Sequence, residues 1–298
     1  MASKKECVTV IIRTRNEEYW IDYCLKSIFD QVVDAEIEVV IVDNLSTDST
    51  LKIAQRYPVS KVIEINKFLP GKAINLGIEV SKGNYIACIS AHCIPAEKNW
   101  LQTFKDNLLI SEKNAGVYGR QIPISFTNAV DKRDLLYVFG LDKRIQIKDF
   151  FFHNANSMIT RKIWEKFPFD ENVTNIEDRV WGKEVIEAGF NIIYEPEACV
   201  YHHHGLHQNN NAKRAKSLVK ILDNIEGETN ANLPAVMKPE NVNIVAIIPI
   251  IQLHQFESFE LVNFQNLIES LDNSKFVNTI YYVANDKVDI ESIKLQWI

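Results

Sequence analysis

The chain has 298 residues and a formal net charge of −6, with 46% apolar and 24% charged residues. These proportions are those of an ordinary globular protein, and the length suits one large α/β domain with a smaller second part. The charge excludes a dedicated nucleic-acid binder, because no excess of Lys and Arg is present to neutralise phosphates.

The cysteines and the N-terminal residues indicate in which cellular compartment the protein is expected. The five cysteines are odd in number and lack paired metal-type spacing, so we expect free thiols in a reducing cytosol rather than a disulfide framework. Residues 1–6 are polar and lack the apolar core of a signal peptide. The longest apolar run is far shorter than the ~20 residues of a membrane span. We therefore expect a cytoplasmic protein with at most peripheral contact at the inner face of the membrane.

The first ninety residues alternate between apolar runs and helical spacing. Asn16 and Ser46 stand where helix N-caps are expected, and they serve more often as caps than as ligands. The alternation predicts a doubly wound, mostly parallel sheet with right-handed crossovers and helices on both faces. The predicted strands lie at residues 8–12, 37–42, 61–65 and 85–89.

The pattern is less regular after residue 95. Gly189 ends one predicted helix. Residues 227–242 read as a linker, because the stretch is poor in large apolar residues and contains Pro234. The predicted domains are thus 1–226 and a small β-α-β part at 243–298. Within the first domain we expect helices at 99–110, 128–145, 161–167 and around 180–186, and strands at 116–124, 191–194 and 198–201.

Six sets of polar residues lie at predicted strand ends or at a helix start. In open α/β sheets, ligands bind at the carboxyl ends of the strands. Each set alone has a simpler structural explanation; an acidic pair, for example, is favoured in the first turn of any helix. Because several sets fall on one edge of one sheet, a single active site explains them together. The sets are residues 14–17, 43, 72 with 75, 90–92, 177–178 and 202–204.

The order of these motifs resembles family 2 glycosyltransferases of the GT-A nucleotide-diphosphosugar transferase fold, in particular the branch of bacterial rhamnosyltransferase-like enzymes. The resemblance implies transfer of a sugar from a nucleotide-sugar donor to a glycan or lipid-linked glycan acceptor in surface polysaccharide (capsule or O-antigen) biosynthesis. A UDP-sugar is the first choice of donor and dTDP-rhamnose the second. The resemblance extends from residue 8 to about residue 207, with motifs at 10–18, 40–50, 71–77, 82–92, 176–181 and 200–204.

The resemblance also assigns the donor and metal sites. Ser90-Ala91-His92 occupies the place of the family's Asp-X-Asp metal motif, so an imidazole stands where the usual metal-binding carboxylate would be. Histidine accepts Mn²⁺ more readily than Mg²⁺, which prefers oxygen. A second protein ligand would be His202, with His204 as the less favoured choice. The implied donor-binding residues are Thr14, Asn16, Glu17, Asp43, Lys72, Asn75, Ser90 and Ala91.

The same resemblance implies the catalytic groups. In an inverting transfer, a carboxylate on the face of the sugar opposite the diphosphate takes the proton of the acceptor hydroxyl. We expect Asp178 to be this base, with Glu177 orienting it or touching the acceptor. Asn154, Asn156 and Trp181 would shape the acceptor side, although Trp181 fits the core equally well.

Two other functions stay open from the sequence. The altered metal motif also suits a sugar-nucleotide-binding module without catalysis. The tail, at residues 243–249 and 276–283, faintly resembles the opening of nucleotide-sugar cytidylyltransferases, so a nucleotidyltransferase is the third hypothesis. The basic residues that such enzymes place after the first strand are absent here, where residues 250–254 read Ile-Ile-Gln-Leu-His.

Overall fold

The structure is a computed structural model that describes residues 6–203, 221, 244–250 and 277–284. Backbone contacts divide the chain into two units, Met1–Gly227 and Glu228–Ile298. In the second unit the structure describes two parallel strands, β10 (Ile244–Ile250) and β11 (Val277–Ala284). The expected linker and the expected helix of the tail lie outside the described residues, so the domain division made from the sequence stays a prediction.

The first half of the large unit has the predicted alternation of strands and helices. Strand β1 lies between β2 and β4 and is parallel to both, so that Arg13 is paired with Val42 on one side and Ser90 on the other. The predicted strands agree with the observed ones to within two residues at each end. The elements are β1 (Cys7–Thr14), α1 (Ile21–Phe29), β2 (Glu36–Asp43), α2 (Thr50–Ala54), β3 (Lys61–Glu64), α3 (Pro70–Glu79) and β4 (Tyr85–Ser90).

The second half completes a mixed sheet of nine strands in the order β3-β2-β1-β4-β8-β6-β9-β5, with β7 also paired to β9. The sequence did not predict β5, β7 or β8, and it divided β9 into two strands. Pro95 belongs to β5, which pairs with β9 alone, and such an edge strand tolerates the missing N–H of proline. The elements are β5 (Cys93–Pro95), α4 (Trp100–Leu109), β6 (Asn114–Pro123), α5 (Ala129–Val138), β7 (Arg144–Gln146), β8 (Asn156–Thr160), α6 (Arg161–Trp164), α7 (Glu177–Glu187) and β9 (Asn191–His202).

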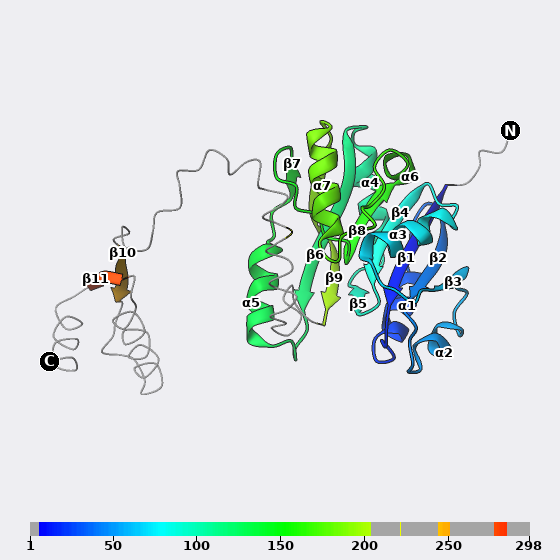
Figure 1. Ribbon diagram of the computed structural model, residues 1–298, viewed down its shortest axis with the longest axis horizontal. Coiled ribbons are helices and arrows are strands. Elements are labelled where there is room, and N and C mark those ends of the chain that lie inside the picture. Colours follow the sequence, from blue (N-terminus) through cyan, green and yellow to red (C-terminus); the bar gives the residue numbers. More distant parts are fainter. Residues whose placement is uncertain (1–5, 204–220, 222–243, 251–276, 285–298) are drawn as a thin grey trace. The chain divides into compact units, whose positions relative to one another are not determined.

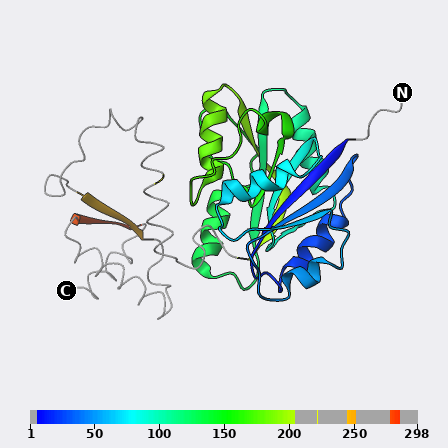
Figure 2. The ribbon, with the colours of Figure 1, turned by 45° about the vertical axis from the view of Figure 1, so that its right-hand side comes forward.

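Helices cover both faces of this sheet, as Figures 1 and 2 show. Side chains alternate between two cores: Val10 and Ile12 pack on the side of α1, α2 and α4, whereas Ile11 packs on the side of α3, α5, α6 and α7. β1 is therefore buried on both faces, which explains its continuous apolar sequence. The strand ends at the edge of this double-sided core are where polar side chains can reach solvent.

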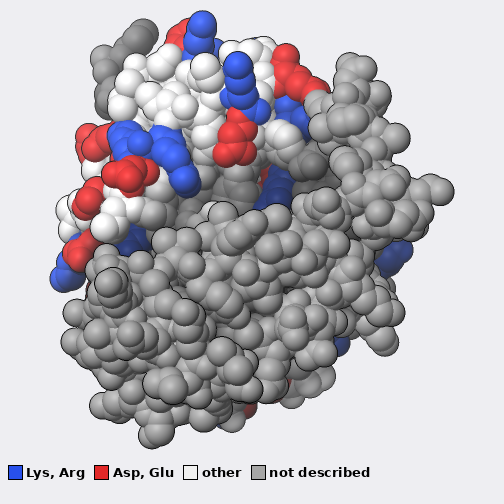
Figure 3. Space-filling model, turned by 90° about the vertical axis from the view of Figure 1, so that its left-hand side faces the viewer, with Lys and Arg blue, Asp and Glu red and all other residues white. Residues whose placement is uncertain are grey.

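The length of the helices and the charge of the surface bear on membrane and nucleic-acid binding. Among the residues that the structure describes, no helix is long and apolar enough to cross a membrane. On the face drawn in Figure 3, the visible Lys and Arg side chains are interspersed with Asp and Glu. The described part of this face is thus mixed in charge and carries no one-sided basic patch of the kind that duplex binding requires.

Among the glycines that the structure describes, Gly119 has the closest neighbour to its Cβ position, and it lies at the register shift between β6 and β9. A Cβ at this position would lie 1.8 Å from the carbonyl oxygen of Ala198 and 2.5 Å from Asn156 Nδ2. We expect Gly119→Ala to lower the free energy of unfolding by about 1–3 kcal/mol or more, because the strands must separate. Gly140→Ala is the matched control, since nothing lies within 4 Å of its Cβ position. Urea unfolding measures both; equal stability of the two variants would contradict the packing described here.

Candidate active site

The strand ends bring chemically active side chains from distant parts of the sequence to one edge of the sheet. Glu17 follows β1, His92 lies in the turn after β4, and His202 is the last residue of β9. Strand β5 runs antiparallel to β9 and places Cys93 directly opposite His202. This arrangement follows from the sheet order and not from closeness in the chain.

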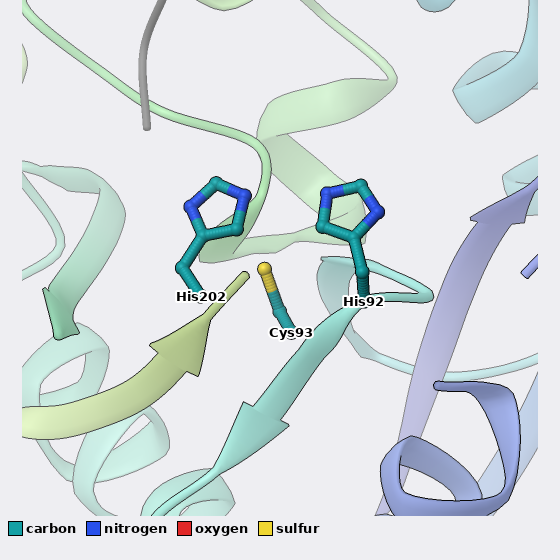
Figure 4. A group of neighbouring side chains, drawn as sticks. All are labelled: His92, Cys93 and His202. Carbon is teal, nitrogen blue, oxygen red and sulfur yellow. The ribbon is translucent and has the colours of Figure 1, made fainter. Parts of the chain in front are cut away.

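His92 and His202 lie side by side, as expected for two residues that bind one cation. Their rings are stacked with centroids 5.1 Å apart and 6° between the planes. The candidate ligand atoms of His92, Cys93 and His202 all lie within 4.8 Å of one another. In Figure 4, one nitrogen of each ring points toward the other ring, and the sulfur of Cys93 points up between them.

Hydrogen bonds on the outer edges of the two rings fix which nitrogen faces inward. Nδ1 of His92 lies 2.7 Å from Glu17 Oε1, and Nδ1 of His202 lies 2.7 Å from Gln121 Oε1. Both partners are acceptors, so each Nδ1 carries the proton and each Nε2 carries the lone pair. Metal-binding histidines use the same arrangement, in which a second group orients the ring. The residues present therefore fit a divalent cation, with His92 and His202 as its ligands.

Two carboxylates open helix α7 in a buried position. Arg13 Nη1 contacts Glu177 Oε1 at 2.9 Å, and Asn154 Nδ2 donates to the same oxygen at 3.2 Å. The backbone N–H of Asn154 donates to Asp178 Oδ2 at 3.1 Å. Burial raises the pKa of both carboxyl groups, and the charge of Asp178 raises the pKa of Glu177 further, whereas Arg13 lowers both. Ile176, just before the helix, has a φ of 53°, an uncommon conformation for a branched residue.

The carboxylates and the imidazoles belong to one polar network. Gln121, which orients His202, places its Nε2 2.9 Å from Nδ1 of His153. His153 immediately precedes Asn154, which contacts both Glu177 and Asp178. The network thus links the end of β9 to the start of α7 through one strand and one loop.

The predicted donor residues divide into two groups. Thr14 is 5% exposed, and its Oγ1 has no hydrogen-bond partner among the described residues. Lys72 lines a cavity of about 390 Å³. Thr14 thus has an unsatisfied buried hydroxyl, and Lys72 places its side chain at a cavity. The other residues lining the cavity are Leu45, Glu64, Ile65, Asn66, Lys67, Leu69 and Leu76.

Asp43 and Asn16 hold the adjoining loop. The carboxylate of Asp43 accepts hydrogen bonds from Ser46 N at 2.7 Å and Ser46 Oγ at 2.5 Å. Asn16 has a φ of 55°, and its Oδ1 accepts from Thr47 N at 2.8 Å. Asn16 and Ser46 are thus not helix caps, as the sequence suggested; the residues that precede α1 and α2 are Trp20 and Ser49. Both polar residues instead join the loops that follow β1 and β2.

Asn75 was expected at the donor site, but it lies in the interior. Its Nδ2 donates to the carbonyl of Phe169 at 2.8 Å, and its Oδ1 accepts from Trp164 Nε1 at 2.9 Å. The residue is 3% exposed. Asn75 therefore fixes the segment after α6 against α3, and the structure corrects the predicted role.

The expected acceptor residues are also interior. Asn156 is fully buried, accepts from Trp100 Nε1 at 2.8 Å and donates to the carbonyl of Ala198 at 2.9 Å. Trp181 is 1% exposed and packs on Phe152 with ring centroids 4.7 Å apart. Neither can face an acceptor, because the core surrounds them. Asn154 is buried as well and holds the carboxylates, and His204 lies outside the described residues.

The sequence reasoning missed Arg13, Gln121 and Cys93 as parts of this site. Arg13 lies in the motif at the end of β1 but was not given a role, and its partner Glu177 is 164 positions away. Gln121 is inside a strand, where its residue type carries no functional signal. Cys93 adjoins His92 and pairs with His202 only because β5 and β9 are neighbours.

The strand order defines a nucleotide-sugar transferase fold of the GT-A class. Four parallel strands form one half of the sheet, and the polar side chains of the candidate site lie at the strand ends. The family profile described as "Glycosyl transferase family 2" matches residues 9–167, more than half of the chain. The chain therefore belongs to glycosyl transferase family 2.

Curated relatives are similar to the chain at moderate identity. The O-antigen chain rhamnosyltransferase WbaN of Salmonella anatum is 27% identical over an alignment of 189 residues that covers 59% of each chain. The glycosyltransferase AglE of Haloferax volcanii is 25% identical over 212 residues, or 68% of each. A poly(ribitol-phosphate) beta-glucosyltransferase of Bacillus spizizenii is 34% identical over 150 residues, covering 45% of this chain and 24% of the relative. The chain thus spans 59% of the length of WbaN.

Solved structures support the fold class. The mannosyltransferase PcManGT from Pyrobaculum calidifontis, in complex with GDP-Man and Mn²⁺, aligns with a TM-score of 0.52 and 20% identity, covering 67% of this chain and 57% of that one. TarS 1–349 of S. aureus, in complex with UDP, aligns with a TM-score of 0.56 and 17% identity, covering 76% and 67%. At these identities the likeness establishes the fold alone.

The buried carboxylate pair should make stability depend on pH. A carboxyl group whose pKa is raised on folding binds more protons in the folded than in the unfolded state, so stability falls as pH rises through that interval. We expect the free energy of unfolding to decrease from about pH 4 upward, and the decrease to be smaller in Asp178→Asn. Urea unfolding across pH measures it. Glu187→Gln, an exposed change on the same helix, is the control; an unchanged slope in Asp178→Asn would contradict the assignment.

Proposed function

We propose that the protein is an inverting, metal-dependent glycosyltransferase that moves a sugar from a nucleotide-sugar donor to a glycan acceptor in bacterial surface polysaccharide biosynthesis. The observation that carries the proposal is the network in which Gln121 and the segment 153–154 connect an imidazole pair to a buried carboxylate pair. A transferase needs these two kinds of group together, one for the leaving diphosphate and one for the acceptor hydroxyl.

Thr14 and Lys72 support a nucleotide donor. A buried hydroxyl without a partner costs free energy that a ligand can recover, and Thr14 Oγ1 is such a group. Lys72 lines a cavity and offers a positive charge to an anionic ligand there. We assign UDP-sugars as the leading donor class, with dTDP-rhamnose second; WbaN, similar to this chain, carries the name rhamnosyltransferase.

His92 and His202 would hold the cation, with Mn²⁺ favoured over Mg²⁺ because imidazole suits it better. When bound, the cation neutralises charge on the departing diphosphate. Glu17 keeps the ring of His92 oriented, and Gln121 does the same for His202. The solved relative PcManGT contains Mn²⁺, which is in line with this assignment.

Asp178 is the proposed base. Burial raises the pKa of its carboxyl group, which strengthens it as a proton acceptor, while hydrogen bonds from the backbone N–H groups of Asn154 and Arg179 stabilise the carboxylate form. The acceptor hydroxyl gives its proton to Asp178 as its oxygen bonds to the anomeric carbon. The bond from that carbon to the diphosphate breaks, and its electron pair leaves with the nucleoside diphosphate. Glu177, held by Arg13, positions the base.

Replacing Asp178 by Asn tests the base. We expect transfer to fall ~10²–10⁴-fold, the usual contribution of general base catalysis, while UDP binding measured by calorimetry stays within about twofold, a change of less than ~0.5 kcal/mol. Glu187→Gln, on the exposed side of α7, should keep full activity. The measurement is release of UDP from a panel of UDP-sugars with glycan acceptors. Near-full transfer by Asp178→Asn would refute the assigned base.

A second candidate, a sugar-nucleotide-binding module without catalysis, is favoured by one observation: Ser90-Ala91-His92 lacks the carboxylates of the family motif. Calorimetry with UDP, with and without Mn²⁺, separates the two. If the protein is the enzyme, UDP should bind more tightly in the presence of Mn²⁺. The His92→Ala variant should lose this increase in UDP affinity, because the cation then has one ligand fewer. A UDP affinity that is the same with and without Mn²⁺ supports the binding module or a metal-free transferase.

The third hypothesis concerns the tail, of which the structure describes only β10 and β11. A nucleotidyltransferase working through this part would release pyrophosphate from CTP. Release of pyrophosphate in the Asp178→Asn variant would assign that activity to the tail rather than to the carboxylate pair.

A further inference from the structure

Cys93 places a third potential ligand beside the two imidazoles. We propose that the Sγ atom of Cys93 binds the cation together with Nε2 of His92 and Nε2 of His202. The site would then hold a thiophilic divalent cation of the Zn²⁺ or Co²⁺ type on protein atoms alone, before any nucleotide arrives. This inference rests on the proposed function, because it concerns the metal of the same site.

The sheet explains why the sulfur lies at this point. Cys93 and His202 are directly opposite residues of antiparallel strands, so their side chains lie on the same face. His92 precedes β5 in a turn, and its ring reaches the same space from the side of β1. Neighbouring residues of a regular strand point to opposite faces. The turn is therefore what allows His92 and Cys93 to converge.

The distances suit a bound cation after a small movement. Zn–N bonds are ~2.0–2.1 Å and Zn–S bonds ~2.3 Å, so a tetrahedral ion holds its ligand atoms roughly 3.3–3.6 Å apart. The three candidate atoms lie within 4.8 Å of one another. Side-chain shifts of about 1 Å would close the site around the ion, which is within the freedom of χ rotations.

The surroundings favour three protein ligands and one open position. Cys93 is fully buried and His202 is 3% exposed, whereas the side chain of His92 is 14% exposed. Catalytic zinc sites commonly have three protein ligands and leave the fourth position for substrate. On the side of His92, a donor diphosphate oxygen can occupy that position.

The sulfur also determines which cation is preferred. A thiolate ligand forms as the thiol proton leaves for solvent and the metal–sulfur bond forms. Thiolates favour Zn²⁺ and Co²⁺ strongly over Mg²⁺, and the order of affinities for nitrogen and sulfur sites places Mn²⁺ below Co²⁺. We therefore expect Co²⁺ and Zn²⁺ to bind more tightly than Mn²⁺, and Mn²⁺ more tightly than Mg²⁺.

Titration of the full chain with Co²⁺, in the absence of nucleotide, tests the sulfur ligand. A thiolate-to-cobalt charge-transfer band should rise in the near ultraviolet and saturate at one equivalent. In Cys93→Ala the band should be absent and the Co²⁺ affinity lower by about tenfold or more. Cys88→Ala is the matched control: Cys88 is also buried, at 1% exposure, but its side chain packs in the opposite core of the sheet. It should keep both the band and the affinity.

Two results would overturn the sulfur ligand. One is Co²⁺ binding by the unchanged chain without the charge-transfer band; the other is equal affinity in Cys93→Ala and Cys88→Ala. If Cys93→Ala does not fold, X-ray absorption of the zinc-loaded unchanged chain decides: a shell of sulfur at ~2.3 Å supports the proposal and a shell of nitrogen and oxygen alone refutes it. None of these readouts needs transfer, so an inactive protein with the band would refute the proposed function and leave the metal site in place.

Discussion

The ion pair between Arg13 and Glu177 is the contact on which the site depends. Two adjacent carboxylates in a buried position repel each other and lose their hydration, a cost of several kcal/mol unless a cation compensates. Arg13 supplies that cation at 2.9 Å and also donates to the carbonyl of Asn154 at 3.2 Å. Its backbone is fixed in β1 opposite Ser90 of β4. The register of the parallel strands therefore determines where the buried carboxylate pair can lie.

The second constraint is the register shift between β6 and β9, which aims Gln121 at the imidazole pair. Side chains alternate along a strand, so an odd number of additional residues in one strand turns its later side chains to the other face relative to the partner strand. Here β9 has three more residues than β6, because Gly119 pairs with Glu195 and Gln121 with Val200. The shift falls between Gly119 and Gln121, and Gln121 then pairs with Val200, two residues before His202. Because the amide of Gln121 contacts both His202 and His153, this irregularity connects the imidazole pair to the carboxylate pair.

The sequence predicted the parallel half of the sheet because strands buried on both faces are continuous apolar runs. It missed β8 because this strand begins with Asn156 and Ser157, whose polar side chains are satisfied by bonds to residues such as Trp100 and Ala198. The same limit applies to the site. Asn75 and Asn156 carry the residue type of a ligand contact, and only tertiary structure reveals that their amides bind the protein's own backbone. The closeness of His92 and His202 could be inferred from the resemblance. The position of Cys93 beside them could not, because it depends on the pairing of β5 with β9, and the sequence did not predict β5.

The charge of the metal site is a last constraint on its ligands. The resemblance implies that relatives bind the cation through a carboxylate, which carries one negative charge, whereas His92 in that place is neutral when it binds a metal. A thiolate from Cys93 would restore the missing charge, so the three proposed protein ligands together would carry the same −1 as one carboxylate. Glu17 adds a second negative group behind His92, at 2.7 Å from its Nδ1. A cation held by these residues would therefore present a similar net charge to a diphosphate, although its protein ligand atoms would be nitrogen and sulfur instead of oxygen.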